Sequence, residues 1–149
     1  MDQLTEEICL AYMRKNPANG VKYIPDEFKN EKMCKILLEN NLLEINSIPI
    51  NLQTKELYNF VISKYGLKIM HVPKEYIDYE MCKLAVTNTG RALKYIPMEI
   101  RTRELCNIAV KEDRQALFNI PDEFKKEMYE IAVDIDCHGL SYIPYNEIT

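Results

Sequence analysis

Apolar residues return along this chain at a fixed interval of 24 residues. An aliphatic residue directly precedes each of a series of prolines, and a second aliphatic residue lies three places before the first. The prolines that mark the interval are Pro25, Pro49, Pro73, Pro97, Pro121 and, one residue early, Pro144. Periods of about 20 to 50 residues are typical of proteins whose units bury their apolar faces against neighbouring units. We therefore expect one helical-repeat domain over residues 1–149, built from about six such units.

Each unit is predicted to contain one long and one short helix. The long helix is indicated by apolar residues at helical spacing, as at Leu105, Ile108 and Ala109. The short segment before each proline, for example residues 91–96, is only about one and a half turns long, so it is predicted as α or 3₁₀ helix. The proline ends it or opens another single turn. The predicted fold class is all-α, a superhelical solenoid of paired long and short helices.

The ends of the long helix are also predicted from the repeat. Residues whose side chains cap helix N-termini share one column, namely Thr5, Asn30, Thr54, Asp78 and Thr102. Gly66 and Gly90 follow the long helix, where they suit a left-handed closing turn. In the last full unit one residue is missing between Lys125 and Glu127, and a lysine stands in the cap column.

Composition restricts the classes of partner. The formal net charge of -4 argues against the basic surface that nucleic-acid binding usually needs. The first residues do not resemble a signal peptide, and no apolar run approaches the length of a membrane span. We expect a soluble protein of the cytoplasm, or of the host cytoplasm if the source is a virus.

The cysteines are predicted to be core residues. Cys9, Cys34, Cys82 and Cys106 occupy one repeat column, which holds tyrosine in two other units. Column mates on stacked helices lie about 8 to 10 Å apart, which is too far for a disulfide. We expect these four thiols to be buried, reduced and without metal, and Cys137, in the column of Gly66 and Gly90, to be more accessible.

No motif in the sequence indicates catalysis. His71 stands in a column that holds tyrosine in three other units, at Tyr23, Tyr95 and Tyr142, so a packing or turn role is the better interpretation. The glutamates that follow most of the prolines recur in nearly every unit and are expected to be structural. No phosphate loop and no HExxH motif is present. We expect no catalytic residues, no cofactor and no enzymatic activity.

Apolar residues also occur at positions that repeat geometry turns outward. On the long helix the outward columns are polar, as at Lys35 and Lys83. On the short helix, the places three and six before the proline point away from the core face. The apolar residues at these places are Leu43, Leu67, Met70 and Phe118, and Ile50 and Met98 follow their prolines on the same side. We predict that these six residues bind a partner; the alternative is that some fold over neighbouring units.

The segment from Ala92 to Lys111, with the pattern ALKYIPxEIRTRELCNIAVK, resembles the uncharacterised short α-helical repeats common in giant DNA viruses of amoebae and in some bacteria. This resemblance extends over essentially the whole chain. It implies an all-α repeat protein and a viral source. It supplies neither catalytic residues nor an established biochemical role.

These observations predict a non-enzymatic module or scaffold for protein–protein interaction, which in a viral setting binds a host protein. One alternative is nucleic-acid or nucleotide binding through helix N-termini and scattered cations, namely Lys22, Lys29, Arg91, Lys94, Arg101 and Arg103. A second alternative is a homo-oligomer formed through the apolar positions or through residues 145–149.

Overall fold

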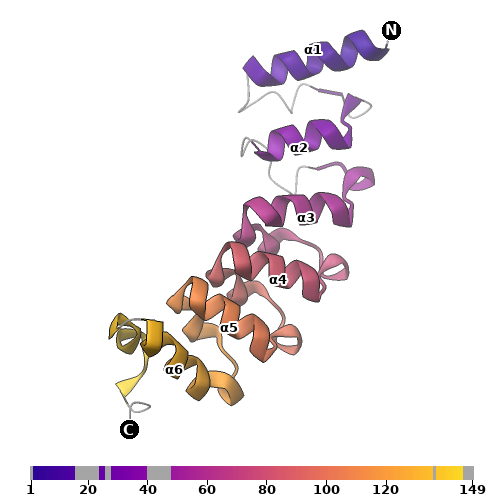
Figure 1. The fold of residues 1–149 in the computed structure, drawn as a ribbon. Helices are drawn as coiled ribbons and strands as arrows, with labels where there is room; N and C mark the ends of the chain where they lie inside the picture. Colours follow the sequence, from indigo (N-terminus) through magenta and orange to yellow (C-terminus); the bar gives the residue numbers. More distant parts are fainter. Residues whose placement is uncertain (1, 16–23, 26–27, 40–47, 136, 146–149) are drawn as a thin grey trace. The chain divides into compact units, whose positions relative to one another are not determined.

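The computed structural model describes residues 2–15, 24–25, 28–39, 48–135 and 137–145, and in these residues it contains helices and no strand. Its α-helices are α1 (Asp2–Lys15), α2 (Glu31–Glu39), α3 (Lys55–Lys64), α4 (Tyr79–Asn88), α5 (Arg103–Glu112) and α6 (Lys125–Ile135) (Figure 1). Its 3₁₀ helices are η4 (Ile50–Leu52), η5 (Gly66–His71), η6 (Lys74–Tyr76), η7 (Gly90–Tyr95), η8 (Met98–Ile100), η9 (Arg114–Asn119), η10 (Asp122–Phe124) and η11 (Cys137–Tyr142). The all-helical prediction is therefore confirmed for the described residues.

The chain divides into two compact units, Met1–Val61 and Ile62–Thr149. The first unit contains α1, α2, η4 and most of α3. Its core consists of large side chains that are almost fully buried, among them Met13, Met33, Leu57 and Tyr58. The side chain of Tyr58 also donates a hydrogen bond of 2.9 Å to Gln53 Oε1.

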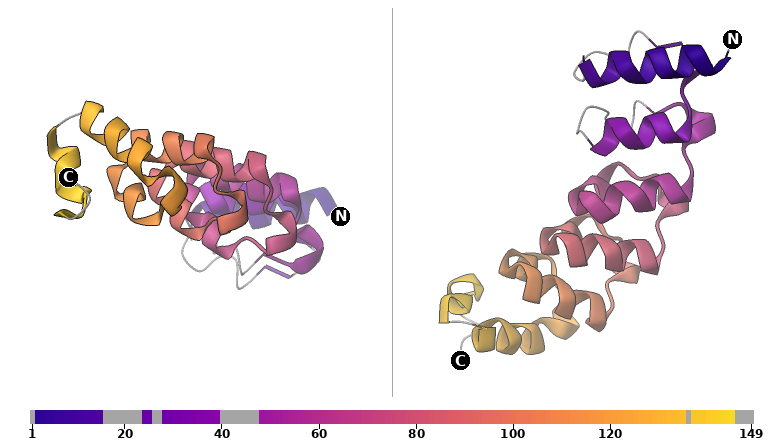
Figure 2. Two further views of the ribbon diagram at one scale, coloured as in Figure 1. Left: turned by 90° about the horizontal axis from the view of Figure 1, so that it is seen from below. Right: turned by 45° about the horizontal axis from the view of Figure 1, so that its top comes forward.

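The second unit has two rows of helices. The long helix α5 packs against α4 on one side and α6 on the other, and the short helices follow in the order η5, η7, η9 and η11, each in contact with the next. Each short helix also packs on the long helices beside it. Figures 1 and 2 show α4, α5 and α6 side by side in this unit. We call the row of η5, η7, η9 and η11 the short-helix ridge.

The interface between the two rows forms the core of the second unit. Small residues lie where the rows approach closely, and Ala85, Ala109 and Ala132 are completely buried. Leu93 of η7 and Leu117 of η9 point into the same interior, with at most 2% of their surface exposed. Burying such side chains contributes roughly 1.5–3 kcal/mol each, so the short helices persist because they cover this core.

Four of the five predicted N-caps are confirmed. The side chains of Asn30, Thr54, Asp78 and Thr102 each accept a hydrogen bond from the backbone amide three residues later, at 2.9, 3.2, 3.0 and 3.3 Å. The prediction for Thr5 is wrong. Thr5 lies inside α1, because the residues before it are already helical and no proline turn occupies their place.

The prolines open single 3₁₀ turns. η4, η6, η8 and η10 each begin one residue after a proline, whose own backbone is extended, as at Pro97 with φ -54° and ψ 141°. The last of these units is one residue shorter, so its 3₁₀ turn is followed directly by the next helix. Lys125, with φ -53° and ψ -51°, is therefore the first residue of α6 and not a separate cap.

The two repeated glycines have a different role from the one predicted. Neither Gly66 nor Gly90 has a backbone in the left-handed region, so the prediction of a left-handed turn is wrong. A Cβ on Gly66 would collide with the carbonyl oxygen of Ala85 in α4, and one on Gly90 with that of Ala109 in α5. Glycine is required because the start of each short helix lies directly against the backbone of the next long helix.

The cysteine column is mostly internal. Cys34, Cys82 and Cys106 are buried, as predicted, and are free of disulfides, whereas Cys9 in α1 is only half-buried. Burial raises the pKa of the Cys34 thiol, and it raises the pKa of Cys82 and of Cys106 to about 11. These thiols are protonated at neutral pH and unreactive as nucleophiles. The side chain of Cys137 lies outside the described residues.

Among the described helices, none combines the length and the apolar character required to cross a bilayer.

Candidate partner-binding groove

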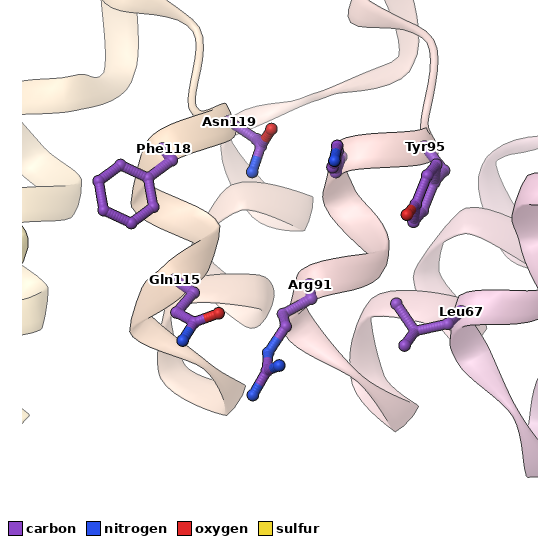
Figure 3. Close-up of a pocket in the computed structure, with 7 residues that line it drawn as sticks. Leu67, Arg91, Tyr95, Gln115, Phe118 and Asn119 are labelled. Atoms are coloured by element: carbon purple, nitrogen blue, oxygen red, sulfur yellow. The ribbon is translucent and has the colours of Figure 1, made fainter.

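A groove of about 460 Å³ crosses three helices of the short-helix ridge, η5, η7 and η9. Figure 3 shows residues from all three helices converging on it. The groove is lined by Leu67, Arg91, Lys94, Tyr95, Gln115, Phe118 and Asn119. All of them belong to the second unit.

The repeat explains why these residues meet. Arg91 and Gln115 both stand six places before their prolines, and Tyr95 and Asn119 both stand two places before them. Because successive short helices lie side by side, residues of one column form a row across the ridge. The groove is therefore a surface that the repeat generates and that the variable columns fill with different side chains.

Apolar side chains lie at the two edges of the groove. Leu67 of η5 is 41% exposed and Phe118 of η9 is 70% exposed. In Figure 3 the side chain of Leu67 extends towards η7, while the ring of Phe118 is turned away from η7 on the other side of η9. The ring of Phe118 also contacts Tyr142 edge to face, with centroids 6.0 Å apart. Exposed aromatic and aliphatic groups in one concave site are typical of protein-binding surfaces.

The middle of the groove is cationic. Arg91 Nε donates a 2.6 Å hydrogen bond to Asp113 Oδ2, and the other carboxylate oxygen accepts one from the backbone amide of Gln115. Burial would raise the pKa of Asp113, but the hydrogen bonds from Arg91 and Gln115 outweigh it and lower that pKa. The ionised carboxylate therefore caps η9 and orients Arg91.

Lys94 is the more available cation. Its side chain is exposed, and its ammonium lies 5.6 Å from the centroid of the Tyr95 ring. Within the described part of the chain Lys94 forms no ion pair. Its charge is thus available to a ligand in the groove.

Arg101 links two of the short helices that line the groove. Its guanidinium donates to three backbone carbonyl oxygens, those of Ile96 at 2.9 Å, Asn119 at 2.7 Å and Lys94 at 3.2 Å. Two of these carbonyls belong to lining residues on different short helices. Burial lowers the pKa of this guanidinium, although it remains protonated as arginine does in proteins. Arg101 therefore fixes η7 relative to η9.

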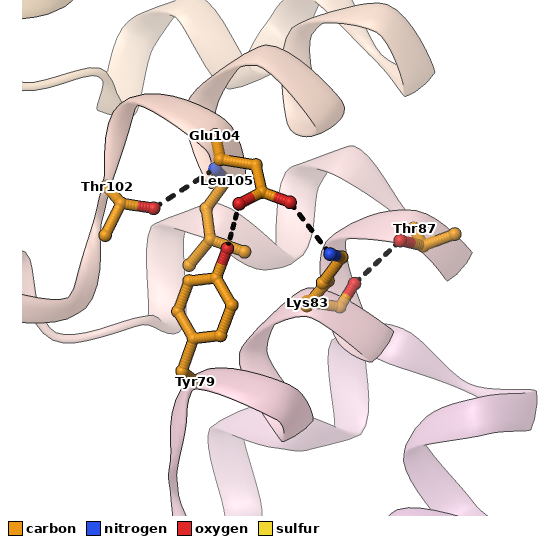
Figure 4. Close-up of polar contacts among 6 residues, drawn as sticks. All are labelled: Tyr79, Lys83, Thr87, Thr102, Glu104 and Leu105. Carbon is orange, nitrogen blue, oxygen red and sulfur yellow. Dashed lines mark hydrogen bonds and ion pairs between the residues drawn. The ribbon is translucent and has the colours of Figure 1, made fainter.

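The outward face of the long helices is paired within itself. Glu104 of α5 accepts a 2.6 Å hydrogen bond from the hydroxyl of Tyr79 and a 2.8 Å hydrogen bond from the ammonium of Lys83, both in α4 (Figure 4). The hydrogen bond from Lys83, followed by that from Tyr79, lowers the pKa of Glu104. Arg103 donates to both carboxylate oxygens of Glu127 in α6, at 2.9 and 2.7 Å. On this face, ion pairs therefore link α4 to α5 and α5 to α6.

The predicted site residues do not all lie together. The structure brings Leu67 and Phe118 into the groove, while Met70, 51% exposed, lies later in η5 and outside the lining. Met98, 56% exposed, belongs to η8, and Ile50, 87% exposed, to η4 in the first unit. Leu43 lies outside the described residues.

The sequence prediction missed the polar lining of the groove. Tyr95, Gln115 and Asn119 were not selected, because a search for outward apolar residues passes over them. Gln115 stands six places before its proline, so considering every residue of the outward columns would have found it, whereas Tyr95 and Asn119 stand two places before their prolines, outside those columns. In the described part of the chain no three His, Cys, Asp or Glu side chains are grouped so that they could hold a metal.

Comparison with known proteins adds a family segment without a known function. Residues 78–125 match the model of a domain of unknown function, DUF4116. This segment extends from the cap of α4 to the first residue of α6 and contains η7 and η9 of the groove. No curated protein and no solved structure matches the chain. Over these two repeat intervals, the chain is similar to DUF4116.

Proposed function

We propose that this chain is a non-enzymatic module for protein–protein interaction, and that the short-helix ridge is its contact surface. The observation that carries the proposal is the groove of about 460 Å³ whose edges are the exposed side chains of Leu67 and Phe118. The exposure of large apolar side chains to water is unfavourable in free energy, and such side chains are enriched at surfaces that bind protein partners. Met70 and Met98 are further exposed apolar residues of the second unit and are candidate contacts in this account.

We further propose that all six repeat intervals form one superhelical solenoid. The packing of α4, α5 and α6 and of the ridge helices supports this within the second unit. The continuation of the proline period through the first unit supports it for the rest of the chain. A solenoid would display the outward columns of its short helices as one extended surface, as repeat proteins commonly do.

Nucleic-acid binding has less support. Of the cations that suggested it, Arg91 is paired with Asp113 and Arg103 with Glu127, while Arg101 donates to three backbone carbonyls. Their charges are therefore largely compensated by these carboxylates and carbonyl oxygens. Retention on a polyanion resin that decreases steeply with salt would favour this alternative. Self-association through the ridge is the third candidate, and light scattering over a concentration series tests it.

The test uses three forms of the full chain as baits: wild type, Phe118→Asp and Lys111→Asp. Lys111 lies on the exposed face of α5, so its substitution is the control for introducing an aspartate. We expect the wild type and the Lys111→Asp variant to retain the same protein, and Phe118→Asp to lose it. Circular dichroism should show equal helix content in all three. Retention of the same proteins by all three baits would contradict the proposal.

A further inference from the structure

We infer that the groove binds an acidic peptide segment of the partner, one that carries a large apolar side chain between carboxylates. This inference rests on the proposed function and adds the chemistry of the partner. It depends on the distribution of charge over the repeat, on the side chains available in the groove, and on the apolar edges of the groove.

Charge is segregated between the ridge and the rest of the repeat. The sequences of η5, η7, η9 and η11 contain Lys68, Arg91, Lys94 and Arg114 and no aspartate or glutamate. The chain as a whole is acidic, with a formal net charge of -4. Its carboxylates are concentrated in the long helices and in the turns after the prolines, as at Glu99 and Glu104. A positive ridge on a negative protein attracts acidic partners and repels basic ones.

The groove itself presents donors and no carboxylate. Its lining contains one arginine, one lysine, the phenol of Tyr95 and the amides of Gln115 and Asn119. The neighbouring carboxylate, Asp113, is held by Arg91 and by the amide of Gln115, so its charge is largely compensated. Lys94 keeps an ammonium that is exposed at the groove. A peptide carboxylate that reaches Lys94 would gain a charge-assisted hydrogen bond.

The edges of the groove define the apolar part of the ligand. Leu67 and Phe118 stand on opposite sides, with the aromatic ring of Tyr95 between the helices that carry them. A volume of about 460 Å³ is within the range of small-ligand pockets, about 300–1,000 Å³, so it accepts one large side chain and adjoining backbone. Aromatic side chains are frequent anchors in pockets of this kind.

A peptide explains these features better than a nucleic acid. Phosphate backbones are bound by rows of uncompensated cations, whereas here Arg91 is shared with Asp113 and Lys94 is the principal free charge of the groove. The exposed aliphatic side chain of Leu67 has no role in contacting phosphates. One cation between two apolar edges fits an acidic segment with an apolar anchor.

The test measures fluorescence anisotropy of a short labelled peptide, in which glutamates flank a single phenylalanine, on titration with the full chain. Two comparison peptides replace the glutamates by glutamines or the phenylalanine by alanine. We expect binding of the first peptide and about tenfold weaker binding of either comparison peptide. The Lys94→Glu variant should bind the first peptide about tenfold less tightly, and the Lys111→Glu variant, with the same change in net charge, within about twofold of wild type.

Any other outcome shows which of the two proposals, the acidic partner or the interaction module, is wrong. If the glutamine peptide binds equally well, or if no peptide binds, the acidic-partner inference is wrong, while the module remains supported as long as Phe118→Asp alone loses the captured protein. Equal weakening by Lys94→Glu and Lys111→Glu would show general charge attraction and would overturn the inference. If single-stranded DNA displaces the peptide and binds more tightly in proportion to its length, the ligand is a nucleic acid and both proposals fail.

Discussion

The long helices α4, α5 and α6 are joined across their outward face by pairs of oppositely charged side chains, whereas the short helices of the ridge contain cations and no carboxylate of their own, and large apolar side chains lie exposed among them. On the long-helix face, Lys83 meets Glu104 and Arg103 meets Glu127 across neighbouring helices. On the ridge, Arg91 is paired with Asp113 at the cap of η9, whereas Lys94 and Phe118 line the groove and are exposed. Both surfaces come from the same repeat, so the difference is one of side chains and not of backbone.

This difference indicates how a repeat separates stability from recognition. The long-helix columns are used to hold neighbouring units in register, because each ion pair spans one repeat interval. On the ridge, the pair of Arg91 with Asp113 also links neighbouring units, but the interior residues and the buried alanines already hold the short helices, so exposed residues such as Leu67 and Phe118 are not needed for that purpose. In the proposed function, these exposed ridge residues are the ones that bind a partner.

The largest expected effect is on binding. Replacing Leu67 and Met70 together by aspartate should weaken partner binding by about tenfold or more, because buried apolar anchors at interfaces often contribute over 1 kcal/mol each. Both side chains are exposed in the structure, so stability should change by less than about 0.5 kcal/mol per site. Binding and thermal melting of the same samples test this. A variant that unfolds would show that these side chains belong to the core.

The next effect is on the stability of the ridge itself. Gly90→Ala should destabilise the chain by about 1–3 kcal/mol, because its Cβ would collide with the backbone carbonyl of Ala109. Lys94→Ala, in the same short helix but exposed, is the control and should change stability by less than about 0.5 kcal/mol. Denaturant unfolding gives both values. Equal stability of Gly90→Ala and wild type would show that η7 does not lie directly against α5.

The smallest effect concerns the long-helix ion pairs. Arg103→Ala removes an exposed pair with Glu127 and should cost less than about 1 kcal/mol, a loss that salt reduces further. Arg101→Ala should cost more, about 1–3 kcal/mol, because it leaves partly buried carbonyls without donors. Thermal unfolding at low and high salt compares the two variants. A larger loss of stability for Arg103→Ala than for Arg101→Ala would contradict the view that Arg101, and not Arg103, contributes more to the stability of the fold.

The local structure could be predicted from the sequence because the residues that determine it recur at the same place in several units. The caps at Asn30, Thr54, Asp78 and Thr102 and the turns after the prolines depend on interactions within a few residues, which a repeat column displays directly. The role of Gly66 and Gly90 was not predicted, because the backbone carbonyl that leaves no space for a side chain there lies about 20 residues away, in the next unit. Glycine has several uses, and the column alone does not distinguish them.

The groove was only partly predictable for a similar reason. The outward exposure of Leu67 and Phe118 followed from helical geometry and the repeat. That Arg91 is held by Asp113, and that Arg101 donates to the carbonyl oxygen of Asn119, depends on contacts between units. The spacing of the short helices, which leaves room for a groove, is set by tertiary packing that no single column encodes.

Site-specific photo-crosslinking tests the central claim most directly, because it works whatever the identity of the partner. A photoreactive phenylalanine analogue at position 118 lies at the edge of the groove, and the same analogue at position 111 lies on the exposed face of α5. In the native cell, we predict a discrete crosslinked product from position 118 and none from position 111. A product from position 111 alone would place the contact surface on the long helices and contradict the account.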